Sequence, residues 1–250
     1  MNISGNTILI TGGGSGIGRA LAEALHAKGN KVIISGRREP LLDEVTAANP
    51  GMVSLLVNLQ DKGDIAAFAK QAVEHFPALN VVVNNAGIMK DEDLPGKGDL
   101  DIAEETVVTN LLGPIRLTAA LLPHLLKQPQ ATVMTVSSGL AFVPLAVTPT
   151  YSATKAAIHS WSMSLRHQLK GTATQVVELV PPYVQTELRG PEQAVDPVAM
   201  PLADFIAEVM TILETQPETR EVIVERCKPL RFAAENGNLA GVFAMVNAQH

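Results

Sequence analysis

Short apolar runs alternate with longer stretches of helical periodicity along almost the whole chain. The runs are nearly continuous in apolar residues, with Val-Ile-Ile at 32–34 and Val-Val-Val at 81–83, as expected for strands that are covered on both faces. The pattern predicts seven strands, at residues 8–11, 31–35, 53–57, 81–84, 132–136, 175–180 and 221–224. Strands that alternate with helices predict a doubly wound, seven-stranded parallel sheet with helices on both faces, an α/β fold in one domain over residues 1–250.

Composition narrows the possible functions. The 250 residues are 46% hydrophobic, enough for a large single core. A net charge of −6 leaves no broad basic surface, so we expect no nucleic-acid partner. Cys227 is the only cysteine and is interpreted as an ordinary thiol. No metal site is expected, because the histidines lack ligand spacing; they are His26, His75, His124, His159, His167 and His250.

No membrane or export signal is expected. The first residues lack a basic segment followed by an apolar core, so a cytoplasmic location is the default. The apolar stretch at 117–126 contains Pro123 and His124 and falls short of the roughly 20 residues that span a bilayer, which favours a buried helix. Residues 91–101 are rich in Asp, Gly and Pro and are expected to form a loop.

A glycine-rich turn follows the first predicted strand. It reads Thr-Gly-Gly-Gly-Ser-Gly-Ile-Gly at 11–18 and leads into a helical pattern. Glycines let the backbone approach a pyrophosphate closely, and the helix that follows offers unpaired N–H groups and the positive end of its dipole. Such a stretch can be a plain turn, but a strand before it and a helix after it favour a dinucleotide site.

Tyr151 and Lys155 are four residues apart, so one helical turn puts both on the same face. A free phenol titrates near ~10, and a neighbouring ammonium favours the phenolate, which moves the pKa toward the working range. Alone, the pair usually marks a solvated helix face. Ser138, at the end of a strand-like run, supplies a second signal for proton-transfer chemistry.

Together these segments resemble the motif set of the short-chain dehydrogenase/reductase family over residues 7 to about 186. The motif residues are Thr11, Gly12, Gly16, Gly18, Asn84, Asn85, Ala86, Gly87, Asn110, Ser138, Tyr151 and Lys155. Pro182 stands where the family commonly has glycine. With the tail at 225–233, this departure resembles the branch named after the Dlt-operon oxidoreductases.

The resemblance implies a Rossmann fold and hydride transfer between nicotinamide and a carbonyl or alcohol. Tyr151 would donate the proton, and Ser138 would bind the carbonyl oxygen. Lys155 would lower the Tyr151 pKa and bind the nicotinamide ribose. Asn110 would distort its helix locally and hold a water beside the lysine. Asn84 would be structural, because an amide at a strand end often serves the turn.

The same resemblance implies a set of cofactor contacts along the carboxyl edge of the sheet. Val184 and Thr186 would anchor the carboxamide, and Asn58 stands where the family commonly has an Asp near the adenine. The expected contacts are Gly12, Gly14, Ser15, Gly16, Ile17, Gly18, Arg37, Arg38, Asn58, Leu59, Asn85, Ala86, Gly87, Tyr151, Lys155, Pro181, Val184 and Thr186.

The residues after the second predicted strand favour NADP(H) over NAD. An acidic residue there would bind the ribose hydroxyls and repel a 2′-phosphate, but Gly36 occupies that point. Arg37 and Arg38 offer guanidinium groups, which suit a phosphate. Two surface arginines on a polar loop are the alternative.

The substrate pocket is expected to be apolar, which favours a hydrophobic ketone or secondary alcohol. The same residues could be core. A short lid is expected at 187–202, where Gly and Pro make the chain irregular. The expected wall residues are Met89, Leu140, Phe142, Val143, Pro144, Pro182, Tyr183 and Leu188.

These features predict an NADPH-dependent carbonyl reductase, or ketoreductase, that also oxidises alcohols; the substrate and the preferred direction stay open. A nucleotide-sensing or scaffolding protein of the same fold is the alternative, since fold does not fix function. An epimerase of the extended form would need a longer segment after Thr186. A homodimer or homotetramer is expected through the apolar helices at 103–126 and 152–169.

Overall fold

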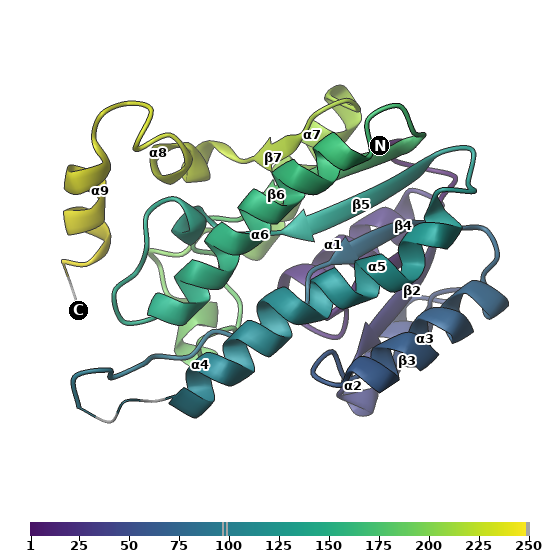
Figure 1. Ribbon diagram of the computed structural model, residues 1–250, viewed down its shortest axis with the longest axis horizontal. Coiled ribbons are helices and arrows are strands. Elements are labelled where there is room, and N and C mark those ends of the chain that lie inside the picture. Colours follow the sequence, from purple (N-terminus) through teal and green to yellow (C-terminus); the bar gives the residue numbers. More distant parts are fainter. Residues whose placement is uncertain (97, 99, 249–250) are drawn as a thin grey trace.

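Seven parallel strands form one sheet in the order β3-β2-β1-β4-β5-β6-β7 in this computed structural model, which describes residues 1–96, 98 and 100–248 (Figure 1). Each strand lies within two residues of its predicted position, so the predicted sheet is confirmed. The strands are β1 Thr7–Thr11, β2 Lys31–Gly36, β3 Val53–Leu56, β4 Leu79–Asn84, β5 Ala131–Val136, β6 Thr174–Val180 and β7 Glu221–Ile223.

The strand order reverses at β1, which pairs with β2 on one side and with β4 on the other. Ile10 is the register partner of both Ile34 and Val83. Connections leave such a point in opposite directions, so a crevice opens outside the carboxyl ends of β1 and β4. The glycine-rich turn begins at this point.

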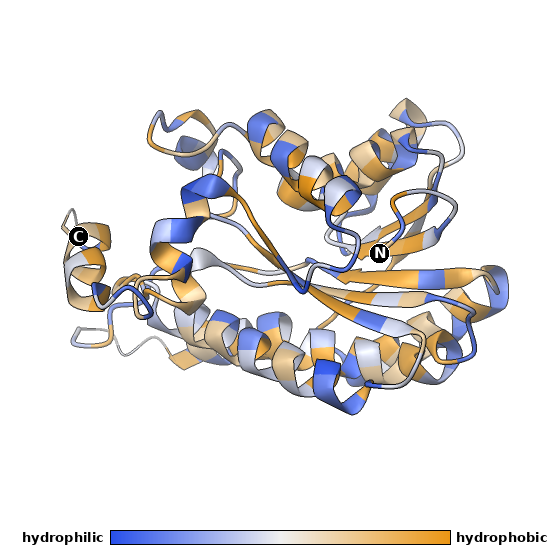
Figure 2. Ribbon diagram, turned by 90° about the horizontal axis from the view of Figure 1, so that it is seen from above, coloured by the Kyte–Doolittle hydropathy of each residue, from blue (hydrophilic) through white to orange (hydrophobic). Residues whose placement is uncertain are grey.

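Helices cover both faces of the sheet, which Figure 2 shows from above. Side chains alternate between the two layers along each strand: Ile8 and Ile10 join one hydrophobic cluster, and Leu9 joins the other. The first cluster includes residues of α1 Gly16–Ala27, α2 Glu39–Ala48 and α7 Leu202–Thr215, and the second includes residues of α3 Lys62–His75, α5 Gly113–Leu125 and α6 Pro149–Gln168. This two-sided burial explains why the strand sequences are apolar throughout.

One long helix lies within three residues of the apolar helix expected at 103–126. α4 Leu100–Val107, a π-helical turn Val108–Leu112 and α5 form a continuous helix at Leu100–Leu125. Its length and composition would suit a membrane span, but α5 packs against α3, β4 and β5 as a core helix does. The last two residues of the loop predicted at 91–101 belong to α4, which begins at Leu100; within the loop, residues 97 and 99 lie outside the described part of the chain.

The segment after β7 folds back against the loop that precedes α6. It contains the short helical turns Glu225–Cys227 and α8 Lys228–Arg231, followed by α9 Leu239–Val246 at the edge of the molecule (Figure 1). The Asn247 side chain accepts from Ala146 N at 2.6 Å and donates to Pro144 O at 3.1 Å. Val143 and Val242 share a small buried cluster there. The tail thus supports the outer side of the β5–α6 connection.

Candidate functional site

The glycine-rich turn between β1 and α1 leaves no room for side chains at Gly12 and Gly18. Gly12 has φ +70°, a left-handed conformation that favours glycine. A Cβ on Gly18 would lie 2.3 Å from Gly12 O and 2.4 Å from Asn85 Nδ2. The first turn of α1 therefore packs directly on the loop, and Gly16, Ile17 and Gly18 of that turn line the crevice. This backbone cradle fits a pyrophosphate.

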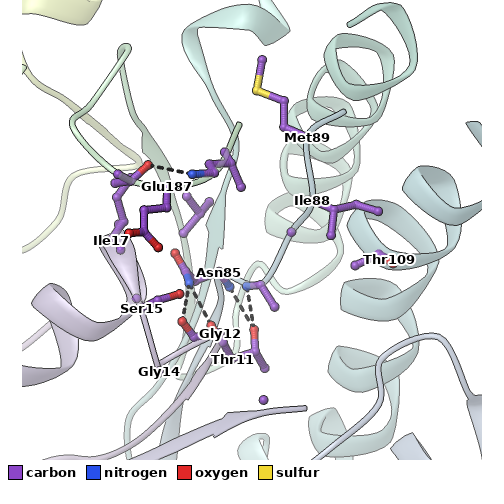
Figure 3. Close-up of a pocket in the computed structure, with 18 of the residues that line it drawn as sticks. Thr11, Gly12, Gly14, Ser15, Ile17, Asn85, Ile88, Met89, Thr109 and Glu187 are labelled. Atoms are coloured by element: carbon purple, nitrogen blue, oxygen red, sulfur yellow. Dashed lines mark hydrogen bonds between the residues drawn. The ribbon is translucent and has the colours of Figure 1, made fainter. Parts of the chain in front are cut away.

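Asn85 ties the end of β4 to this turn. Its Nδ2 donates to Thr11 O at 2.9 Å, while Thr11 Oγ1 accepts from Asn85 N at 3.0 Å and Ala86 N at 3.1 Å, as drawn in Figure 3. Asn84 points elsewhere and donates to Thr118 Oγ1 at 2.9 Å in the core. Asn84 therefore links the sheet to α5, and Asn85 links the end of β4 to the glycine-rich turn.

A cavity of about 770 Å³ follows the crevice from the second strand to α6. Every cofactor contact expected from the sequence lies on its wall, from the glycine turn through Asn58 and Leu59 to Pro181 and Thr186. Such a volume suits a ligand of cofactor size. The residues present therefore fit a bound dinucleotide.

The turn after β2 contributes Gly36, Arg37 and Arg38 to one end of this cavity. Arg38 Nη2 donates to Ser15 Oγ at 2.9 Å, which joins the arginine turn to the glycine turn. Arg37 is exposed. A Cβ on Gly36 would meet only Leu42, at 3.8 Å. A larger residue would therefore fit at this position, and the missing acidic side chain is not a consequence of crowding.

Ser138, Tyr151 and Lys155 come together at the other end of the cavity. Ser138 directly follows the Ser137 that leaves β5, and its Oγ accepts from Leu140 N at 3.1 Å. Tyr151 and Lys155 lie in the first turns of α6, and both are buried. Lys155 Nζ donates to Val136 O at 2.8 Å and lies 5.5 Å from the centre of the Tyr151 ring.

Burial dominates the protonation of this pair. It raises the pKa of Tyr151 to about 12, against the lowering effect of the neighbouring Ser138 hydroxyl. It lowers the pKa of Lys155 to about 8, and Glu178 opposes that change. The expectation that Lys155 moves the Tyr151 pKa toward neutrality is therefore not met in this structure. Loss of solvation is the largest effect on the Tyr151 pKa, and Lys155 Nζ is directed to the carbonyl of Val136.

Asn110 lies in the π-helical turn Val108–Leu112, so the predicted local distortion of the helix is confirmed. Its side chain is buried and forms two hydrogen bonds with the backbone of Ile88. A Cβ on Gly87 would lie 3.2 Å from Asn110 Oδ1 and 3.7 Å from Lys155 Nζ. Asn110 therefore lies behind Gly87, which lines the cavity. Because Gly87 has no side chain, the segment can pass closely between Asn110 and Lys155.

Glu92 fixes the start of α6. One carboxylate oxygen accepts from Thr150 N at 3.0 Å, and the other accepts from Thr150 Oγ1 at 2.6 Å. A carboxylate at a helix N-terminus satisfies a free N–H group and complements the dipole. The loop after β4 therefore positions the helix that carries Tyr151.

Only part of the expected substrate wall lies at the cavity. Met89, Pro182 and Leu188 line it. Phe142 instead packs on His159 and under Arg231, and Tyr183 donates to Asp196 at 3.0 Å. Val143 is in the buried cluster with Val242, and the tail holds Pro144. Leu140 lies in the short helix Gly139–Ala141 and is not among the residues that line the cavity. The β5–α6 connection thus packs on the tail, so Met89, Pro182 and Leu188 are the expected wall residues that line this cavity, and the role of the others stays a prediction.

The expected lid segment contributes contacts that the sequence did not indicate. Gln193 Nε2 donates to Val184 O at 2.7 Å and Thr186 Oγ1 at 3.1 Å, which fixes the strand end that the cofactor is expected to contact. Arg189 Nη2 donates to both carboxylate oxygens of Asp91 at 2.9 Å. This ion pair links the loop after β4 to the lid. Charged residues in a Pro- and Gly-rich stretch give no signal of such a link.

Comparisons with known proteins agree with this geometry. Residues 6–196 match the family model described as short chain dehydrogenase. The chain is 46% identical over 189 residues to "Uncharacterized oxidoreductase DltE" of Bacillus subtilis (strain 168), which covers 75% of each protein.

Solved structures share the fold over nearly the whole chain. A short chain dehydrogenase from Burkholderia cenocepacia J2315, in complex with NADP, has a TM-score of 0.83 at 24% identity and covers 97% of this chain and 99% of that one. A short chain dehydrogenase/reductase from Burkholderia phymatum, in complex with NAD, has a TM-score of 0.82 at 21% identity and covers 96% of each. The family match over most of the sequence, on a cavity built for a dinucleotide, establishes that this chain is an oxidoreductase of the short-chain dehydrogenase family.

Proposed function

We propose that this protein is an NADPH-dependent carbonyl reductase that also oxidises the corresponding secondary alcohol. One observation carries the proposal: Ser138, Tyr151 and Lys155 meet on the wall of the same cavity that the glycine turn closes at its other side. A binding module would need the glycine turn alone. The added cluster supplies a proton donor and a hydrogen-bond donor for a reacting oxygen.

The bound cofactor would supply the hydride that adds to the carbonyl carbon. Tyr151 is protonated at neutral pH, since its pKa is about 12, and can donate its proton to the oxygen as charge develops there. The Ser138 hydroxyl stabilises that charge by a hydrogen bond. Lys155, held by Val136 O, is the nearby positive charge that favours the phenolate left after transfer. In alcohol oxidation the proton returns to Tyr151.

Arg37 and Arg38 favour NADPH as the cofactor. A 2′-phosphate on the adenosine ribose would be directed to the turn after β2, where both guanidinium groups are available and no acidic side chain opposes them. The two Burkholderia structures hold NADP in one case and NAD in the other, so the fold alone is compatible with either. The charge of this turn supports NADP(H).

The substrate we propose is a hydrophobic ketone or secondary alcohol. Met89, Pro182 and Leu188 line the same cavity as Ser138 and Tyr151. Arg189 is also on this wall, but Asp91 already neutralises its charge. Apolar walls with few polar groups favour a neutral substrate over a charged metabolite.

A panel of neutral ketones with NADPH, and of the matching alcohols with NADP⁺, tests the proposal through the change in nicotinamide absorbance. We expect turnover of hydrophobic members in both directions, and loss of turnover in Ser138→Ala with unchanged NADPH binding. Tight NADPH binding without turnover of any member would instead favour the non-catalytic, nucleotide-sensing alternative.

A further inference from the structure

Glu178 is a fully buried carboxylate in the middle of the sheet. It lies on β6, in register with Thr135 of β5 and Glu221 of β7, so the two glutamates are neighbours on one face. An ionised carboxylate in such a position is costly unless positive groups compensate it. The reaction proposed above gives this residue no role.

α6 presents a polar stripe to the same face. Lys155, His159, Ser162 and Arg166 recur at helical spacing on this side of the helix. His159 Nδ1 is 2.8 Å from Glu178 Oε2, one turn beyond Lys155. Further along, Ser162 and Arg166 reach Thr135 Oγ1 at 2.9 Å and Val176 O at 3.0 Å. The catalytic helix is therefore seated on β5 and β6 through polar contacts.

The charged groups around Glu178 come from three elements. Those on α6 are Lys155, His159 and Arg166, and those on or next to β7 and α8 are Arg220, Glu221 and Arg231. Glu221 is already neutralised, because Arg231 donates to it from Nε at 2.9 Å and from Nη2 at 3.2 Å. Glu178 Oε1 has no hydrogen-bond partner among the described residues. Glu178 is therefore held through Oε2 by His159, while its second carboxylate oxygen is directed to no donor among the described residues.

The effects on pKa follow this arrangement. The hydrogen bond with Glu178 raises the pKa of His159 against burial. Glu178 also raises the pKa of Lys155, against the larger lowering by burial. The ammonium that faces the cavity is therefore attracted by one carboxylate on the opposite, sheet side.

We propose that Glu178 is a positioning residue for the reaction: its carboxylate, anchored by His159, is the counter-charge that keeps the buried Lys155 protonated and seated beside Tyr151. This inference rests on the proposed function, since it assigns Lys155 a charge that the chemistry uses. Glu178 touches neither cofactor nor substrate, because it lies behind the cavity wall.

His159, Glu178 and Glu221 could also hold a metal ion, since one ligand atom from each lies within 4.8 Å of the others. Arg231 already occupies Glu221 as a bidentate cation, and a metal would have to displace it. The protein's own cations therefore account for this cluster.

The test compares Glu178→Gln with Glu221→Gln, a matched removal of one carboxylate from the same sheet face. For each protein, kcat/KM for carbonyl reduction and NADPH affinity are measured against pH. In the wild type, kcat/KM and NADPH affinity should both fall as the pH rises and Lys155 loses its proton. In Glu178→Gln this fall should occur at a pH lower by about one unit, the smaller end of the effect of an opposite charge. For Glu221→Gln it should stay within error of the wild type. An unmoved Glu178→Gln profile, or an equal shift in both variants, overturns the proposal.

Two further variants keep the carboxylate and separate charge from packing. In His159→Gln and Glu178→Asp, kcat/KM and NADPH affinity should fall at the same alkaline pH as in the wild type, even where the melting temperature is lower. A shift of that pH in these two variants would show that packing and not the charge of Glu178 sets the profile, which contradicts the proposal. This comparison remains decisive if Glu178→Gln fails to fold. Stabilisation of the wild type by Zn²⁺, absent in Glu178→Gln, would replace it with a metal site.

The NADPH affinity profile keeps the two proposals apart. A wild type that reduces no carbonyl would sink the proposed function, while the pH dependence of NADPH binding would still decide the role of Glu178. An active wild type with identical profiles in Glu178→Gln would sink this inference alone.

Discussion

Asn110 binds both polar groups of the Ile88 backbone: Oδ1 accepts from Ile88 N and Nδ2 donates to Ile88 O, each at 2.8 Å. This closed pair of hydrogen bonds joins the π-helical turn to the segment that follows Asn85 and Gly87. Nδ2 also donates to Thr154 Oγ1 of α6 at 3.5 Å, so the amide links the π-helical turn to both the Ile88 segment and the helix that carries Lys155. Asn110 therefore shapes the cavity wall from behind.

Asn110→Asp tests this geometry. The new carboxylate can accept from Ile88 N but cannot donate to Ile88 O, which leaves a buried carbonyl unpaired at a cost of about 1–3 kcal/mol. We expect a lower melting temperature together with weaker NADPH binding. Asn80→Asp is the control: Asn80 also accepts from a backbone N–H and donates to other groups, but at the start of β4. It should lower stability without changing NADPH affinity. Equal NADPH affinity in both variants would contradict the account.

Gly18→Ala should abolish cofactor binding. The added methyl would lie 2.3 Å from Gly12 O, so the turn or α1 must shift. Gly36→Ala is the matched control, because its methyl meets only Leu42 at 3.8 Å. Isothermal titration with NADPH should show binding for Gly36→Ala and none for Gly18→Ala. Normal NADPH affinity in Gly18→Ala would show that the glycine-rich turn does not hold the pyrophosphate.

Cofactor preference should depend on Arg37, with Arg38 assisting. A charge-assisted contact is worth about 1.5–3 kcal/mol, so Arg37→Ala should lower the NADPH preference on the order of 10- to 100-fold. Combining Gly36→Asp with Arg37→Ala should reverse it, because repulsion of the 2′-phosphate is added to lost attraction. The ratio of kcat/KM for NADPH and NADH measures both effects. A wild type that favours NADH, or an unchanged ratio in Arg37→Ala, would make these arginines plain surface charges.

Self-association is expected through the long helix at Leu100–Leu125 and through α6. Large apolar side chains are exposed along them, with Leu100 at 69%, Met163 at 54% and Leu126 at 45%. Exposed apolar surface of this kind favours an interface between copies. Light scattering at micromolar concentration should give the mass of a dimer or tetramer, and Met163→Glu should reduce it. A wild-type mass of one chain would contradict the expectation.

The sequence predicted the features that depend on local pattern. Continuous apolar runs gave the strands, and residues fixed by backbone geometry, such as Gly12 and Gly18, gave the cofactor crevice. Asn110 was assigned through the family resemblance, and its helix is distorted as expected. Each of these signals lies within one short stretch of chain.

The features that the sequence did not predict depend on contacts between distant segments. Phe142 looks like a pocket residue, yet Arg231, far along the chain, covers it. Arg189 lines the cavity and forms an ion pair with Asp91, which is 98 residues away in the sequence. The Tyr151 pKa rises through burial, which spacing to Lys155 cannot reveal. Glu178 lies in an apolar strand run, and only the sheet register brings it beneath the catalytic helix.

The central claim is that the Tyr151 hydroxyl donates the proton in carbonyl reduction. Tyr151→Phe removes that hydroxyl and keeps the ring that packs in the wall, so NADPH affinity should be unchanged.

The decisive measurement is kcat for reduction of the best ketone by wild type and Tyr151→Phe at saturating NADPH. General acid catalysis contributes about 10²- to 10⁴-fold, and we expect a loss in that range. Near-normal carbonyl reduction by Tyr151→Phe, with NADPH bound as in the wild type, would contradict the mechanism.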